Sequence, residues 1–117
     1  MTTKGIDILL IETHNWGKSV AFWKSLGYEL EFETDHHSGR LRHPAGGLSL
    51  FIAERPPQHA LQVVPGLSVP DAAAFEPPAS GTVKRPFIKE HWGVLQMLIA
   101  DPDGREISIE APLKDKP

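Results

Sequence analysis

The sequence contains no cysteine, has no large excess of either charge and has no long apolar run. The absence of cysteine excludes disulfides, thiolate metal sites and thiol nucleophiles. Twelve Lys and Arg against fifteen Asp and Glu give a formal net charge of −3, which offers nucleic acid or an anionic membrane no electrostatic attraction. No apolar run is long enough to span a bilayer, and residues 1–5 lack the apolar core of a signal peptide. We therefore expect a cytoplasmic protein with neither nucleic-acid nor membrane partners.

The length of 117 residues corresponds to a single domain that can bury its own core. Proline is frequent at eleven residues, and its placement indicates loops. The pairs Pro56-Pro57 and Pro77-Pro78 cannot lie inside a helix or a central strand. We interpret residues 56–59 as a linker between two similar halves.

The first half is predicted to contain one helix and four strands. Asn15 can cap a helix of about ten residues, and Gly27 can end it by adopting a left-handed conformation. Trp16, Val20 and Trp23 recur on this segment at helical spacing. We expect Trp23 and its neighbour Phe22 to lie in the core. The predicted strands are residues 6–13, 28–34, 40–43 and 47–53.

The second half is predicted to repeat this order with a much shorter helix. A strand at 63–69 precedes a helical turn or two at 70–75, and further strands follow at 83–89, 93–100 and 106–111. Three pairs of similar segments lie about half the chain length apart, which favours a tandem duplication. They are His43-Pro-Ala-Gly46 with Asp101-Pro-Asp-Gly104, Leu48-Ser-Leu50 with Ile107-Ser-Ile109, and Asn15 with Asp71.

Two groups of motifs resemble the glyoxalase/bleomycin-resistance/extradiol-dioxygenase family, also called the vicinal oxygen chelate superfamily. The first is Asn15-Trp-Gly-Lys-Ser-Val-Ala-Phe-Trp23 with Leu26-Gly27, and the second is His91-Trp-Gly93 with Ala100-Asp-Pro-Asp-Gly104 and Ile107-Ser-Ile109. The resemblance covers nearly the whole chain. It implies an α+β fold of two tandem βαβββ modules, at about 5–55 and 59–112 with a tail at 113–117. It further implies that curved mixed sheets form a cup and that the protein is a homodimer.

The resemblance also implies four positions at which many members of the family hold a divalent metal. In this sequence those positions fall on Ile8, Ser49, Val64 and Ser108. Ile and Val cannot ligate a cation, and neutral hydroxyls are poor replacements for its hydration shell. We therefore expect no metal and no other cofactor. A shift in strand register would instead bring in Asp7, Glu12, His59 or Glu110.

The alternation of strand residues assigns the side chains of each sheet to two faces. If Leu9 and Ile11 pack under the helix, Ile8, Leu10 and Glu12 lie on the other face. In the same way, we expect five residues to lie on the face away from the cup, namely Leu48, Leu50, Ile52, Ile107 and Ile109. Seven of the predicted ligand-binding residues lie on the strand faces that line the expected cup, and three lie near its rim. The seven are Leu10, Glu12, Ser49, Phe51, Gln96, Ser108 and Glu110, and the three are Trp16, His91 and Trp92.

An apolar surface with a few convergent polar groups is typical of a small-molecule site. The leading hypothesis is metal-free binding or sequestration of an aromatic or amphipathic molecule, as in the bleomycin-resistance proteins that the sequence resembles. A cationic group on the ligand would suit Glu12 or Glu110. The alternatives are a metal-dependent lyase, isomerase or dioxygenase with ligands in a shifted register, and a partner-binding module whose cup has no function.

Overall fold

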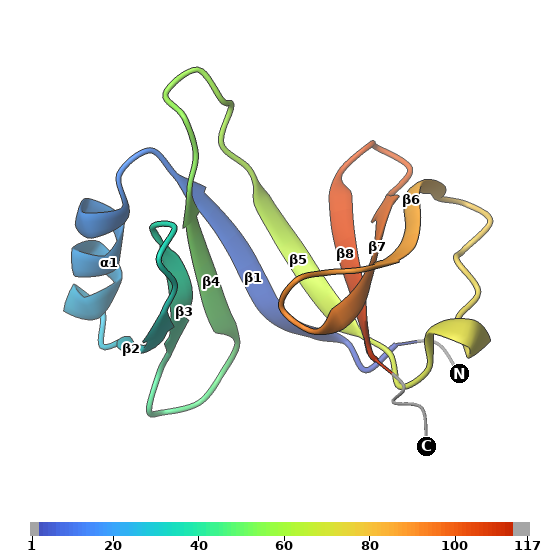
Figure 1. The fold of residues 1–117 in the computed structure, drawn as a ribbon, viewed down its shortest axis with the longest axis horizontal. Coiled ribbons are helices and arrows are strands. Elements are labelled where there is room, and N and C mark those ends of the chain that lie inside the picture. The colour runs from blue at the N-terminus through green and yellow to red at the C-terminus, as the bar shows by residue number, and fades with distance from the viewer. Residues whose placement is uncertain (1–2, 114–117) are drawn as a thin grey trace. The chain divides into compact units, whose positions relative to one another are not determined.

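The structure is a computed structural model that describes residues 3–113, so residues 114–117 of the predicted tail lie outside the described part. The chain divides into two compact units. We call Ile8–Val63 the N-terminal unit, and residues 3–7 with 64–113 the C-terminal unit. Residues 3–113 form eight strands and one α-helix, which Figure 1 draws as a ribbon. Within residues 3–113 no helix is both long and apolar enough to cross a membrane.

The N-terminal unit has the predicted order of one helix and four strands. Its elements are β1 (Ile6–Thr13), α1 (Trp16–Ser25), β2 (Glu29–Glu33), β3 (Ser38–Arg42) and β4 (Ser49–Glu54). The Asn15 side chain accepts a hydrogen bond from the amide of Lys18 and so begins α1, while Gly27, at φ +98°, follows its end. The strands are ordered β2-β3-β4-β1, and only β4 and β1 run parallel.

The core of this unit lies between α1 and one face of its sheet (Figure 1). Leu41, Leu50 and Ile52 are buried there, and Leu9, Ile11, Trp16 and Trp23 pack against them. The predicted faces of β1 and β4 are therefore confirmed at Leu9, Ile11, Leu50 and Ile52, and Trp23 is in the core as expected.

Two core predictions in this unit were wrong. Phe22 is 58% exposed because α1 directs Trp16, Val20 and Trp23 toward the sheet and leaves Phe22 on its flank. Leu48 is 38% exposed and precedes β4, because Gly46 and Gly47 both adopt positive φ and extend the turn up to it.

The C-terminal unit repeats the strand pattern with almost no helix. Its elements are β5 (Val63–Ser68), the 3-10 turn η1 (Ala72–Ala74), β6 (Thr82–Lys89), β7 (Val94–Ala100) and β8 (Glu106–Pro112). The order β5-β8-β7-β6, with β5 and β8 parallel, matches that of the N-terminal unit. The predicted helix of a turn or two is reduced to three residues. Pro70 precedes this segment and the Pro77-Pro78 pair follows it, so a longer helix has no room.

The core of the C-terminal unit lies on the face of the sheet that η1 covers. Ile109, Met97 and Ile99 are buried there, and Ile107 and Phe75 pack against them. The predicted positions of Ile107 and Ile109 are therefore confirmed. In each unit we call the opposite face of the sheet, away from α1 or η1, the helix-distal face.

Candidate functional site

A hydrogen-bonded chain of side chains crosses the helix-distal face of the C-terminal unit. Gln96 on β7 donates from Nε2 to Ser108 Oγ on β8 at 2.8 Å. Arg85 on β6 donates from Nη2 to Gln96 Oε1 at 3.0 Å and to Glu90 Oε2 at 2.9 Å. Arg85 Nε is buried and has no hydrogen-bond partner. The predicted residues Gln96 and Ser108 are thus brought together, and an arginine on the neighbouring strand orients the amide.

Trp92 stands at the end of this face. It precedes Gly93, which adopts φ +88° and allows the tight turn between β6 and β7. Its indole Nε1 donates to Glu110 Oε2 at 3.3 Å, and Glu110 is the cross-strand partner of Gln96. The ring of His91 meets the Trp92 ring edge-on at 4.9 Å. Trp92 is 50% exposed, so a half-exposed aromatic ring is held by Glu110, the cross-strand partner of Gln96.

The helix-distal face of the N-terminal unit carries a row of four side chains, one from each strand. Cross-strand register places Leu10 beside Phe51, Phe51 beside Arg40, and Arg40 beside Phe32. The rings of Phe32 and Phe51 are 6.3 Å apart. Arg40 Nη2 donates to Ser49 Oγ at 3.3 Å. The predicted residues Leu10, Ser49 and Phe51 therefore share one face with an arginine.

Glu12 takes part in a separate network at the end of β1. Its carboxylate accepts from Arg55 Nε at 3.0 Å, from His59 Nε2 at 3.2 Å and from the amide of Gln62 at 3.0 Å. Only 8% of the Glu12 side chain is exposed. These contacts attach the linker predicted at residues 56–59 to the sheet, so Glu12 has a structural role in addition to its place on this face.

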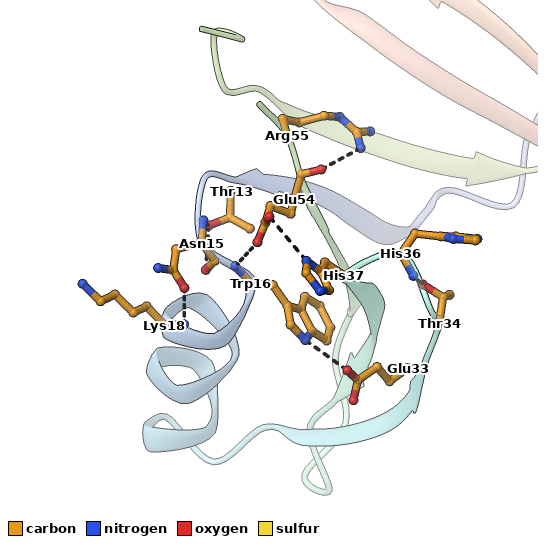
Figure 2. Close-up of polar contacts among 10 residues, drawn as sticks. All are labelled: Thr13, Asn15, Trp16, Lys18, Glu33, Thr34, His36, His37, Glu54 and Arg55. Carbon is orange, nitrogen blue, oxygen red and sulfur yellow. Dashed lines mark hydrogen bonds and ion pairs between the residues drawn. The ribbon is translucent and has the colours of Figure 1, made fainter. Parts of the chain in front are cut away.

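The N-terminus of α1 is fixed by a third polar cluster (Figure 2). Glu54 at the end of β4 accepts from the Trp16 amide at 2.8 Å, and His37 Nδ1 lies 3.5 Å from its other carboxylate oxygen. The hydrogen bond from the Trp16 amide, helped by His37, lowers the pKa of Glu54 from its ordinary value. The Trp16 indole donates to Glu33 at 3.2 Å, and its ring packs in the core under α1. Trp16 thus lies on the helix side of the sheet.

Solved structures of known proteins resemble this arrangement of strands. A glyoxalase/bleomycin resistance protein/dioxygenase superfamily member from Vibrio splendidus 12B01 has a TM-score of 0.68 at 16% identity, over 89% of this chain and 96% of that one. A methylmalonyl-CoA epimerase from Mycobacterium tuberculosis also scores 0.68, at 13% identity, over 96% of this chain and 90% of that one. The chain has the glyoxalase/bleomycin resistance/dioxygenase fold. The resemblance seen in its motifs is confirmed at this level.

The glyoxalase-type fold does not by itself identify an activity. A structure described as an NAD-dependent benzaldehyde dehydrogenase from Legionella pneumophila has a TM-score of 0.66 at 15% identity, over 91% of this chain and 98% of that one. The reaction in its name differs from those in the names of the other two structures, and all three sequence identities are low. No protein-family model and no curated protein matches the sequence. The function is therefore argued from the residues.

The residues at the four positions that the sequence resemblance assigns to a metal do not fit a divalent cation. Ile8 pairs with Ser49 in the register of β1 with β4, and Val64 lies on β5 two residues before Gly66, the partner of Ser108. Ile8 and Val64 have no ligating atom in their side chains, and the hydroxyls of Ser49 and Ser108 are weak ligands.

The side chains that a shifted register would bring in already have other contacts. Asp7 accepts from Ser68 Oγ at 3.0 Å, Glu12 and His59 bind each other, and Glu110 accepts from Trp92. No three His, Asp or Glu residues in the part of the chain that the structure describes are grouped to hold a metal ion.

Sequence reasoning missed the two arginines on the helix-distal faces. Arg40 alternates with the buried Leu41, so its face could have been predicted once β3 was known to begin at Ser38. Arg85 lies between two irregularities in the pairing of β6 with β7, where simple alternation fails. Its contact with Gln96 had no signal in the sequence.

Proposed function

We propose that the protein binds a small aromatic or amphipathic molecule on the helix-distal face of the C-terminal unit, and does so without a metal. The observation that carries this proposal is the half-exposed ring of Trp92, hydrogen-bonded to Glu110, on the face that also carries the hydrogen-bonded pair of Gln96 and Ser108. A rigid ring buries a large area at little entropic cost, and a few fixed polar groups select what lies against it. Sequestration, as in bleomycin-resistance proteins, is the form of this function that we favour.

The charges near Trp92 favour a neutral or cationic ligand. Arg85 is already paired with Glu90 at 2.9 Å, and a second carboxylate, Glu110, contacts the indole. An anion would meet two carboxylates and one guanidinium group. The second N–H of Gln96 Nε2 can instead donate to a neutral acceptor such as a carbonyl oxygen, since only one of its two donors is used by Ser108.

A metal-dependent lyase, isomerase or dioxygenase finds no support in the residues at the four metal positions. Two hydroxyls, an isoleucine and a valine supply neither the charge nor the imidazole that such chemistry needs. That the two sheets form a cup stays a prediction, and the site proposed here needs only the C-terminal unit.

The test is a binding experiment on the full chain. Thermal-shift screening with planar aromatic and amphipathic compounds, bleomycin included, selects compounds for calorimetric titration. Trp92→Ala should weaken binding by about 1–3 kcal/mol, the range for aromatic anchors. Phe22→Ala removes an exposed ring on α1, which belongs to the other unit, and should leave the affinity unchanged.

Two outcomes would overturn the proposal. One is that Trp92→Ala binds the selected compounds with the affinity of the wild type. The other is that elemental analysis finds a stoichiometric divalent metal whose removal by a chelator abolishes binding.

Trp92→Ala should also be less destabilising than Leu or Ile truncation in the core, which costs about 2–5 kcal/mol. Ile109→Ala provides the reference for that comparison.

A further inference from the structure

Arg40 has far fewer acceptors than its guanidinium group can use. That group carries five N–H donors, and within residues 3–113 its one hydrogen bond is the 3.3 Å contact from Nη2 to Ser49 Oγ. Nε lies 3.3 Å from Glu31 Oε1, close enough for an ion pair, but the angle does not make a hydrogen bond and the buried Nε–H has no partner. The terminal nitrogens Nη1 and Nη2 therefore keep N–H donors that a further acceptor can use.

The carboxylate beside Arg40 is shared. Glu31 lies 3.3 Å from Arg40 Nε and 3.7 Å from Arg42 Nη1, so one carboxylate serves two guanidinium groups. Glu29 is the cross-strand partner of Arg42 and not of Arg40. Arg40 therefore has incomplete charge compensation, and 41% of its side chain is exposed to an incoming ligand.

Apolar side chains surround this cation on the helix-distal face. Phe32 and Phe51 flank Arg40 across the sheet, and Leu10 continues the row beyond Phe51. Phe32 is exposed and Phe51 is half-buried, so an apolar group can lie against both rings. A cation with unused donors in the middle of an apolar row matches a molecule with an anionic head and an apolar body.

We propose that the helix-distal face of the N-terminal unit binds a small amphipathic carboxylate. The carboxylate accepts from Arg40 through the terminal Nη1 and Nη2, a bidentate geometry that suits a planar guanidinium group and leaves the buried Nε to Glu31, and Ser49 donates its hydroxyl hydrogen to the same head. The aryl or alkyl body lies on Phe32, Phe51 and Leu10. This site uses none of the residues around Trp92, and the inference does not rest on the function proposed for them.

Arg85 provides an internal contrast to Arg40. Both arginines have a buried Nε without a partner, but Nη2 of Arg85 already has three acceptors, among them Glu90 and Gln96. The guanidinium donors of Arg85 are therefore occupied, whereas those of Arg40 make one long hydrogen bond to a neutral hydroxyl. Arg40 is the arginine that can accommodate a new carboxylate.

The experiment compares two probes of the same shape and different charge. The full chain is titrated with 4-phenylbutyrate and with 4-phenylbutanol, and binding is followed by calorimetry and by amide chemical shifts. We expect the carboxylate to bind at least about tenfold more tightly, since charge-assisted hydrogen bonds are stronger than neutral ones. The amides of Leu10, Ser49 and Phe51 should shift.

Arg40→Gln should remove this preference, so that the two probes bind within about twofold of each other. Arg42→Gln is the matched control, because it removes the same charge from the same face of the same strand. It also leaves Glu31 to Arg40 alone, so it should reduce the preference only in part. A thermal melt establishes that both variants fold. If Arg40→Gln does not fold, Arg40→Lys takes its place, and it should lower the preference because an ammonium group cannot form the fork.

Four results would overturn the inference, three of them from the experiments above. The alcohol binds as tightly as the carboxylate, Arg42→Gln reduces the preference as much as the Arg40 variant does, or the shifted amides belong to the C-terminal unit alone. Trp92→Ala separates this site from the other one, since it should leave 4-phenylbutyrate binding unchanged. A loss of 4-phenylbutyrate binding in Trp92→Ala would assign the carboxylate to the Trp92 face and likewise overturn the inference.

Discussion

Removal of the Glu12 carboxylate should destabilise the protein more than removal of any surface carboxylate. Three donors converge on it, Arg55 Nε, His59 Nε2 and the Gln62 amide, at 3.0, 3.2 and 3.0 Å. Hydrogen bonds to charged groups contribute about 1.5–3 kcal/mol each. Arg55 and His59 are 34% and 41% exposed, however, so both can bond to water once the carboxylate is gone.

We therefore expect Glu12→Ala to lower the free energy of unfolding by about 2 kcal/mol, which is less than the roughly 3–5 kcal/mol for breaking a fully buried ion pair. Glu12→Gln keeps an acceptor for the Gln62 amide and loses only the charge, so it should cost about 1 kcal/mol. Urea unfolding followed by tryptophan fluorescence and circular dichroism measures both values.

Glu106→Gln is the matched control for this measurement. Its ion pair with Lys84, at 3.1 Å, lies on the surface, and its loss should change stability by no more than about 1 kcal/mol. If Glu12→Ala costs no more than Glu106→Gln, the convergence of donors on Glu12 does not stabilise the linker, and the reasoning is wrong.

Three further predictions concern backbone packing, pH and assembly. Gly39→Ala should destabilise the protein by about 1–3 kcal/mol, because the new Cβ would lie 2.5 Å from the Phe32 carbonyl oxygen. Gly46→Ala should cost less, because Gly46 lies in open space and only its φ of +103° opposes the substitution. Thermal melts of the two variants measure this order, and the reverse order would contradict the prediction. The pKa of Glu54 is lowered in the folded state. The contribution of its carboxylate to stability is therefore present above the ordinary pKa of about 4.3 and is lost as the pH falls through the lower pKa of the folded state. Acid unfolding of Glu54→Gln should lack this pH dependence, and a profile like that of the wild type would refute the prediction. The edge strands β2 and β6 need a partner or a cover, so light scattering should give a homodimer of about twice 12.9 kDa, and a monomer mass at micromolar concentration would contradict it.

Much of the N-terminal unit could be predicted because its local signals agree. The bounds of β1 were predicted as they occur, since an apolar run ends where Asn15 caps the next helix. Alternation on β1 and β4 gave the correct faces because both strands are regular and one face of each packs against α1. Phe22 failed for the opposite reason, because its apolar character alone does not say on which side of a ten-residue helix it lies.

The candidate sites were less predictable because they depend on contacts between strands. Gln96 and Ser108 were each placed on the correct face, yet nothing in either segment indicates that their side chains meet. The position of Arg85 depends on two irregularities in strand pairing, and the partner of Ser108 depends on the length of β5. Such features arise when the sheet assembles, and local propensity does not encode them.

The duplicated serines explain how two similar modules can differ in the chemistry they favour. Ser49 and Ser108 occupy matching places on β4 and β8, and each accepts a hydrogen bond from the adjoining strand. In the N-terminal unit the donor is Arg40, which brings a charge to the face. In the C-terminal unit the donor is Gln96, which is neutral, and the nearby guanidinium group of Arg85 is paired with Glu90. Glutamine in the place of arginine, together with Glu110 in the place of Phe51, therefore supports an anionic ligand as the proposal for the first face and a neutral or cationic one for the second.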